Sequence, residues 1–134
     1  MRRRIAVLVP IGLLSLTVAS YAGCRVQERR KEGKRVEAHA KAQALKNQID
    51  GRFSVGSSQT ETLAALKRAY EGRFIYTGLV QGYGPPGLHY WIVVAEQPSS
   101  SWVCDDTASV TVSADFDAGQ FVGTTIKVVP HGCL

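Results

Sequence analysis

The sequence predicts an α+β protein: an N-terminal membrane helix and a polar helical stalk, followed by one helix packed on an antiparallel sheet of about four strands. Three observations support this prediction. An apolar run begins at Ile5, the stretch behind it is rich in helix-forming residues, and the last part changes to an extended pattern. The predicted organisation is a signal or anchor segment (1–24), a polar helical stalk (25–52) and a small α+β extracytoplasmic domain (53–134).

Charge divides the chain at the same boundary. The 134 residues have a net charge of +5. Residues 1–52 contain 12 Lys and Arg against 4 Asp and Glu, whereas residues 53–134 contain 4 against 7. The basic character therefore belongs to the leader and stalk, as expected for residues that flank a membrane segment. A nucleic-acid-binding domain should carry the excess on the domain itself, so we expect no nucleic-acid partner.

The first segment is directed to a membrane. Residues 5–23 are apolar, and as a helix they would be about 28 Å long, enough to cross a bilayer. Arg2, Arg3 and Arg4 precede them, which predicts a cytoplasmic N-terminus. We therefore expect the membrane to be a partner through residues 5–23 and the domain to be exported, to the periplasm or cell surface. The basic residues directly after this segment favour the reverse topology, with a cytoplasmic domain.

Three fates of this segment are consistent with the sequence. Small residues before and at Ala22 would let a signal peptidase cut after it. Alternatively, Tyr21-Ala22-Gly23-Cys24 resembles a bacterial lipobox, which would make Cys24 a lipidated first residue. In the third, the segment stays uncut as an anchor.

The number of cysteines that each fate leaves in the mature protein helps to choose among the three. The chain contains Cys24, Cys104 and Cys133. Cleavage after Ala22 would leave an odd thiol, whereas lipidation or anchoring leaves Cys104 and Cys133 as a pair. In an oxidising compartment their disulfide would stabilise the domain by about 3–4 kcal/mol on the chain-entropy model. In a cytoplasmic domain they would be two free thiols.

The stalk contains strong helix formers and no proline. Its thin apolar stripe consists of Val26, Val36, Ala40, Leu45 and Ile49. These positions do not hold a heptad, which favours a solvated spacer, with an oligomerisation stalk as the alternative.

A helix is predicted at residues 58–72. Ser58 and Glu61 have the spacing of a capping box, and Gly72 is a plausible stop. The predicted buried face consists of Leu63, Leu66 and Tyr70.

The remaining chain reads as strands separated by turns. Strands are predicted at residues 74–80, 88–96, 108–114 and 121–129, with a short extended piece at 102–104. Consecutive strands joined by short turns favour an antiparallel meander, with the helix on one face.

The cysteine-bounded end resembles a known family. Residues 98–104 (PSSSWVC) and 129–133 (VPHGC) are similar to the C-terminal region of type IV pilins and minor pilins. In that family, a Trp-x-Cys strand is joined by a disulfide to a Pro-x-x-Cys near the chain end. The order of parts is also similar, with an apolar helix, a polar helical half and an antiparallel sheet. The resemblance implies a filament subunit or an assembly component.

No catalytic or metal-binding constellation is evident. His39, His89 and His131 lack metal-ligand spacing, and the aspartates of residues 115–119 read as turn residues. We therefore predict a membrane-anchored, non-enzymatic envelope protein without a cofactor, acting through binding or assembly with a protein partner or with itself. The alternatives are a lipoprotein with a small partner-binding domain, and a small secreted ligand-binding protein or enzyme.

Overall fold

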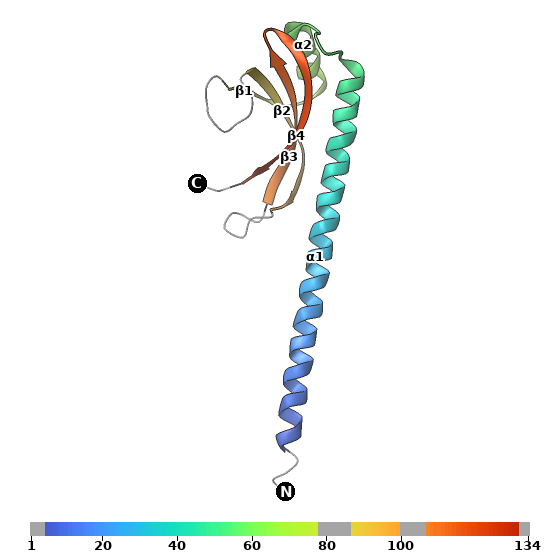
Figure 1. Ribbon diagram of the computed structural model, residues 1–134, viewed down its shortest axis with the longest axis vertical. Coiled ribbons are helices and arrows are strands. Elements are labelled where there is room, and N and C mark those ends of the chain that lie inside the picture. The colour runs from blue at the N-terminus through green and yellow to red at the C-terminus, as the bar shows by residue number, and fades with distance from the viewer. Residues whose placement is uncertain (1–4, 78–86, 100–106, 132–134) are drawn as a thin grey trace. The chain divides into compact units, whose positions relative to one another are not determined.

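The structure is a computed structural model that describes residues 5–77, 87–99 and 107–131, with side chains for 21–73, 87–99 and 107–131. The predicted α+β class is confirmed, with helices first and an antiparallel sheet after them. The chain divides into two units, Met1–Lys34 and Arg35–Leu134. The described elements are α1 (Ile5–Arg52), α2 (Gln59–Ala69), β1 (Arg73–Thr77), β2 (Gly87–Pro98), β3 (Thr107–Asp117) and β4 (Gln120–Pro130) (Figure 1).

The sheet is an antiparallel meander in the order β1-β2-β3-β4. Three long strands, β2, β3 and β4, form its body, and the five-residue β1 lies at one edge. Ala118 (φ 47°) and Gly119 (φ 78°) connect β3 to β4. Positive φ at both central residues is the requirement of a type I′ hairpin turn, whose twist matches that of the strands.

The strands extend beyond their predicted ends. β3 continues to Asp117, although a turn was predicted from residue 115, because a two-residue hairpin needs no longer connection. β2 likewise continues to Pro98. Residues 78–80 of the first predicted strand, and the short piece predicted at 102–104, lie outside the described residues.

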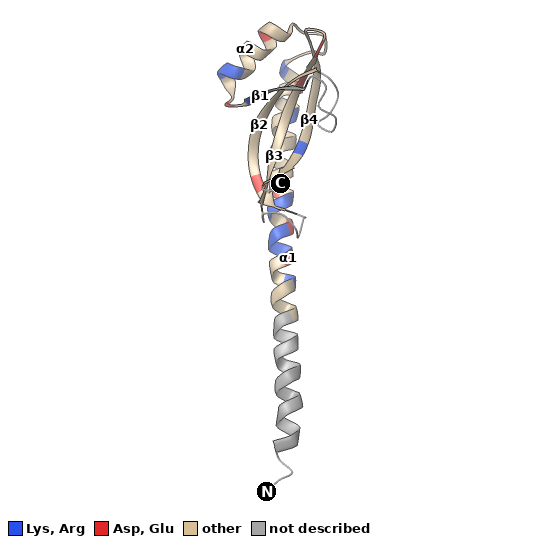
Figure 2. Cartoon of the chain, turned by 90° about the vertical axis from the view of Figure 1, so that its left-hand side faces the viewer, with Lys and Arg blue, Asp and Glu red and all other residues tan. Residues whose placement is uncertain are grey.

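The second part of α1 packs against one face of the sheet (Figures 1 and 2). Ala38, Ala42 and Ile49 are at most 2% exposed. They share one core with Leu66 of α2 and with Ile92, Val110, Val112, Ala114, Phe116 and Phe121 of the sheet. The compact unit thus begins at Arg35. This differs from the predicted organisation, which placed residues 25–52 in a stalk outside the domain.

The residues that bury this part of α1 agree only in part with the predicted stripe, because Leu45 and Ile49 are shared but Ala38 and Ala42 take the places of Val36 and Ala40. Ala38, Ala42, Leu45 and Ile49 follow one another at intervals of four, three and four residues, which places them on one helix face. Val36, by contrast, is 61% exposed. Alanines let a helix lie close to a sheet but contribute little to a hydrophobic pattern. The prediction of a solvated spacer is therefore wrong for residues 35–52.

Polar contacts join both ends of this packed part to the sheet. Near the start, Arg35 donates from Nε to the carbonyl of Pro98 (3.3 Å) and from Nη2 to that of Ser99 (3.2 Å). These contacts hold the helix at the end of β2.

At the other end, Asp50 accepts a hydrogen bond from Thr124 Oγ1 of β4 (2.6 Å) and an ionic one from Lys46 Nζ (2.5 Å). Lys46 also donates to Thr124 Oγ1 (3.2 Å). Partial burial acts to raise the pKa of Asp50, but the hydrogen bonds from Lys46 and Thr124 and the charge of Lys46 outweigh it and hold the pKa below its usual value.

The start of α2 is set by β4 rather than by a capping box. Ser58 precedes the helix, but its side chain makes no capping hydrogen bond, so the capping-box prediction is wrong. Instead, Ser58 forms a backbone bridge to Gln120. Further backbone hydrogen bonds join Gly56 and Ser57 to Phe121, and Gln59 to Gly119.

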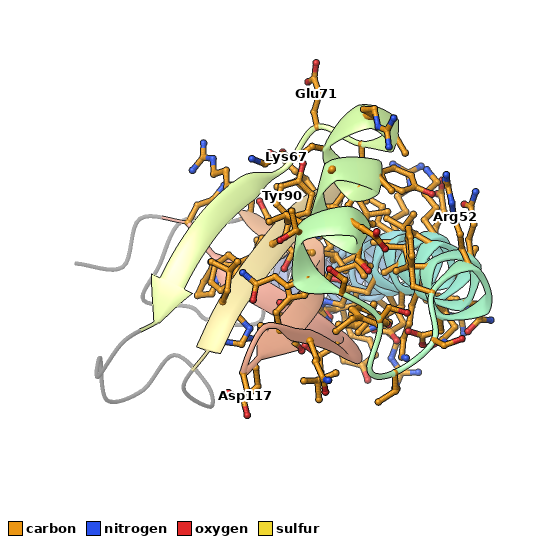
Figure 3. All side chains as sticks on the ribbon, turned by 90° about the horizontal axis from the view of Figure 1, so that it is seen from above. Arg52, Lys67, Glu71, Tyr90 and Asp117 are labelled. Carbon is orange, nitrogen blue, oxygen red and sulfur yellow. The ribbon has the colours of Figure 1, made fainter. Side chains whose placement is uncertain are left out.

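Gly72 has a different function from the predicted helix stop, since α2 ends at Ala69. A Cβ at Gly72 would lie 2.5 Å from Cζ of Tyr90 and 2.8 Å from the carbonyl oxygen of Trp91. Only glycine permits this close approach. Tyr90, seen beside α2 in Figure 3, donates its hydroxyl to the carbonyl of Tyr70 (2.8 Å), and burial raises the pKa of the phenol.

The first part of α1 begins in the predicted membrane-directed segment, residues 5–23. Side chains before Tyr21 lie outside the described residues. Within the described part of the chain, no helix has the length and apolar character needed to span a membrane. Residues 21–34 are exposed throughout.

Candidate functional site on the outer face of the sheet

The face of the sheet opposite α1, here called the outer face, is mostly polar. Along β3, the inner positions Val110, Val112 and Ala114 alternate with hydroxyl and carboxyl side chains. Strand partners share a face. The outer face therefore includes His89, Trp91, Val93, Glu96 and Pro98 of β2, Thr107, Ser109, Thr111, Ser113 and Asp115 of β3, Thr125, Lys127 and Val129 of β4, and His131 after β4.

Asp115 is the centre of a polar cluster on this face. Its carboxylate lies 2.6 Å from Nδ1 of His89, which is only 1% exposed. Ser113 donates to Oδ1 (2.5 Å) and Thr125 donates to Oδ2 (3.0 Å). Since these partners come from β2, β3 and β4, the cluster joins the three long strands.

This arrangement favours a structural function over catalysis. In a hydrolytic triad the serine hydroxyl contacts the imidazole, and the carboxylate orients the imidazole from its other side. Here both Ser113 and His89 contact the same oxygen of Asp115. Loss of the carboxylate would remove a partner of a buried imidazole, at a cost of about 1–3 kcal/mol in folding free energy.

His131 forms a second cluster at the far end of β3. Its Nε2 lies 2.5 Å from the hydroxyl of Ser109, and its Nδ1 lies 3.2 Å from the hydroxyl of Thr107. The backbone N–H of His131 also donates to the carbonyl of Thr107 (3.2 Å). These contacts extend the pairing of β3 and β4 past Pro130.

Trp91 and Lys127 meet across the middle of the outer face. Nζ of Lys127 lies 5.3 Å from the centroid of the indole ring, within the range of a cation–π contact. The two residues belong to β2 and β4, with Ser113 and Thr111 of β3 as their respective strand partners. Both of these hydroxyl residues are buried, at 0% and 3% exposure.

The sequence anticipated some of this site. Tyr90 and Trp91 lie on opposite faces, as the two-residue strand period predicts. Asp115, however, is a strand residue bound to His89 rather than a turn aspartate. The spacing of Ser113 and Asp115 on one strand face was a usable signal, but only the strand register identifies His89 as their neighbour.

Of the residues predicted from the sequence as sites, the structure describes one, Cys24, which belongs to neither cluster. Cys24, the predicted lipidation site, is exposed and free. Cys104 and Cys133, the predicted disulfide, lie outside the described residues. Thr107 and His131, the nearest described residues after Cys104 and before Cys133, are joined by a backbone hydrogen bond. No cluster of metal-ligating residues occurs among the residues that the structure describes.

Comparisons of the chain with protein-family models, with curated proteins and with solved structures found no match.

Proposed function

We propose that this protein is a membrane-anchored, non-enzymatic envelope protein that acts through binding or assembly, with its domain exported. The observation that carries the proposal is the construction of α1. The helix begins in the apolar run of residues 5–23, and its residues 35–52 pack along an antiparallel meander. Such a construction couples an anchor directly to a folded domain.

The resemblance to type IV pilins and minor pilins supports an assembly function within this proposal. The order of parts, with a long N-terminal helix, a sheet packed on its second half and a cysteine near the end, agrees with that resemblance. Residues 1–24 lack the acidic residue that pilins carry near the start of the mature helix. We therefore propose a pilin-like component rather than a standard filament subunit.

The outer face supports a non-catalytic function. The hydroxyl, imidazole and carboxylate groups of the Asp115 and His131 clusters bond to one another and hold strands together. Groups used in this way are poorly placed to act on a substrate.

Mass spectrometry of the N-terminus of protein isolated from membranes tests the anchor. An uncut chain beginning at Met1 is the expected result. A diacylglyceryl group on Cys24 would replace the anchor proposal with the lipoprotein alternative. An N-terminus at Gly23 would support the secreted alternative.

A thiol count on the native protein tests export of the domain. With Cys104 and Cys133 joined, only Cys24 should react under native conditions, and reduction should release two more thiols. Three reactive thiols without reduction would contradict an exported domain.

Disulfide crosslinking in membranes tests self-association through α1. In a Cys24→Ser background, we expect Val36→Cys on α1 to give covalent dimers on mild oxidation. Val122→Cys on β4 is the matched control, because both valines are exposed, at 61% and 50%. Equal dimer yields from both would contradict association through the helix.

A further inference from the structure

The exposed segment of α1 that follows the apolar run carries most of its charge as cations. Residues 25–34 contain five basic side chains against two acidic ones. All of them are exposed, and they precede the compact unit that starts at Arg35. Figure 2 shows these cations as blue bands along α1. We call this segment, with its cations Arg25, Arg29, Arg30, Lys31 and Lys34, the basic collar.

The cations of the basic collar spread over about two thirds of the helix circumference, and Glu28 and Glu32 lie on the remaining side. At 3.6 residues per turn, Arg25 and Arg29 lie on one side, Arg30 and Lys34 share another, and Lys31 lies on a third. A protein groove would be matched by charges on a single side. A layer of lipid headgroups surrounds a helix completely, and it is better matched by cations spread over several sides.

The aromatic neighbour of the basic collar also fits a headgroup layer. As a helix, residues 25–34 extend for about 15 Å, about twice the roughly 5–8 Å thickness of the headgroup region of one leaflet, so the collar would begin in this layer and continue past it. Just before the collar, Tyr21 accepts hydrogen bonds from Nε (3.1 Å) and Nη2 (2.7 Å) of Arg25, whose guanidinium lies 5.1 Å from the ring centroid. Tyrosine is enriched at the membrane–water interface because its ring is apolar and its hydroxyl is polar.

We propose that the basic collar binds the anionic headgroups of phospholipids and gathers them around α1. This inference rests on the proposed membrane anchoring through residues 5–23. Each cation near an anionic surface contributes attraction that salt screens. The compact unit, residues 35–134, carries 8 basic against 9 acidic residues, so it has no net positive charge to attract anionic lipid.

Lipid-selective quenching of a fluorophore tests the proposal on the full chain. A fluorophore is attached to Gln27→Cys in a Cys24→Ser background, its position is verified by peptide mass mapping, and the protein is reconstituted in phosphatidylcholine vesicles containing some phosphatidylglycerol. In parallel samples, either the phosphatidylglycerol or an equal amount of phosphatidylcholine is brominated near the carbonyl end of its acyl chains. We expect the anionic lipid to quench about twofold to fivefold more strongly at low salt, and the difference to vanish at high salt.

Charge variants test whether the preference for anionic lipid depends on the cations of the basic collar. The variant R29Q/R30Q/K31Q should quench equally with both brominated lipids, whereas R29K/R30K should keep the preference. K41Q/K67Q/R68Q, which removes three cations outside the collar, is the matched control and should behave like the parent protein.

The possible outcomes distinguish failure of the collar proposal from failure of the proposed membrane anchor. Equal quenching by both lipids in the parent protein overturns the collar and leaves the anchor intact. No quenching by either lipid overturns both proposals. Loss of the lipid preference when duplex DNA is added would also overturn the collar proposal, because it would identify a different anionic partner. Crosslinking of the collar to the acidic domain of a second copy would do the same.

Discussion

The two parts of α1 on either side of Arg35 have opposite environments within one continuous helix. Residues 21–34 are all exposed, whereas residues 35–52 bury Ala38, Ala42 and Ile49 against the sheet. Both parts carry many charges and few large apolar side chains. What differs is the spacing of small and apolar residues on one face. Regular spacing, rather than overall hydrophobicity, decides which part belongs to the compact unit.

The largest expected effect comes from placing a charge in the buried face. Ala42 is 0% exposed, so Ala42→Glu forces a carboxylate into the helix–sheet core and should lower the free energy of unfolding by about 3 kcal/mol or more. Urea unfolding of the full chain in mild detergent, followed by tryptophan fluorescence, measures this. The same substitution at the exposed Ala40 should change stability by less than about 0.5 kcal/mol. Equal losses would contradict the assignment of the faces.

Neighbouring basic residues test the start of the packed part. Arg35→Ala removes two hydrogen bonds to the end of β2 and should destabilise the domain by about 1–2 kcal/mol. Lys34→Ala should stay within about 0.5 kcal/mol of the parent protein, because Lys34 is exposed. Thermal unfolding by circular dichroism compares the two. A larger effect at Lys34 would place the start of the packed part elsewhere.

Asp50 gives the packed part a dependence on pH. Its pKa is depressed in the folded state, so its contribution to stability is present above the unfolded pKa of about 3.9 and is lost as pH falls through the lower folded value. Asp50→Asn should cost about 0.5–1 kcal/mol at neutral pH, since the site is partly exposed. Unfolding measured from neutral to acidic pH should show the two proteins converge. A constant difference would assign the effect to something other than this carboxylate.

The smallest expected effect uses two glycines within α1. A Cβ at Gly33 or Gly51 meets nothing within 4 Å, and neither residue has a positive φ. Gly51→Ala should raise the stability of the domain by about 0.5–1 kcal/mol, because alanine favours a helix that the packed part must form on folding. Gly33→Ala should raise helix content without moving the unfolding midpoint. A shift of the midpoint by Gly33→Ala would show that the exposed part folds together with the domain.

Several parts of the fold could be predicted from local pattern. The β-branched run of residues 88–96 lies within β2, and the short turns between strands predicted the antiparallel meander. Leu66 was correctly placed on the buried face of the second helix. These predictions succeed because strand alternation and helical period are encoded in neighbouring residues.

The predictions that were wrong concern features that depend on contacts between residues distant in sequence. Ser58 has the spacing of a cap, yet the backbone of β4 satisfies this region instead. Gly72 looks like a helix stop, yet its small size serves the approach of Tyr90. In both cases, a contact with a residue distant in sequence is present in place of the local helix-end interaction that the sequence predicted.

The sequence by itself determined the α+β class, the succession of helices and strands, and the separation of charge between the leader and the domain. Only the tertiary structure decided where the compact unit begins and which polar groups meet. Ala38 and Ala42 become core residues because a sheet lies against them, and His89 meets Asp115 because the register of β2 and β3 pairs them. Burial and strand register are properties of the assembled fold, which neighbouring residues alone do not specify.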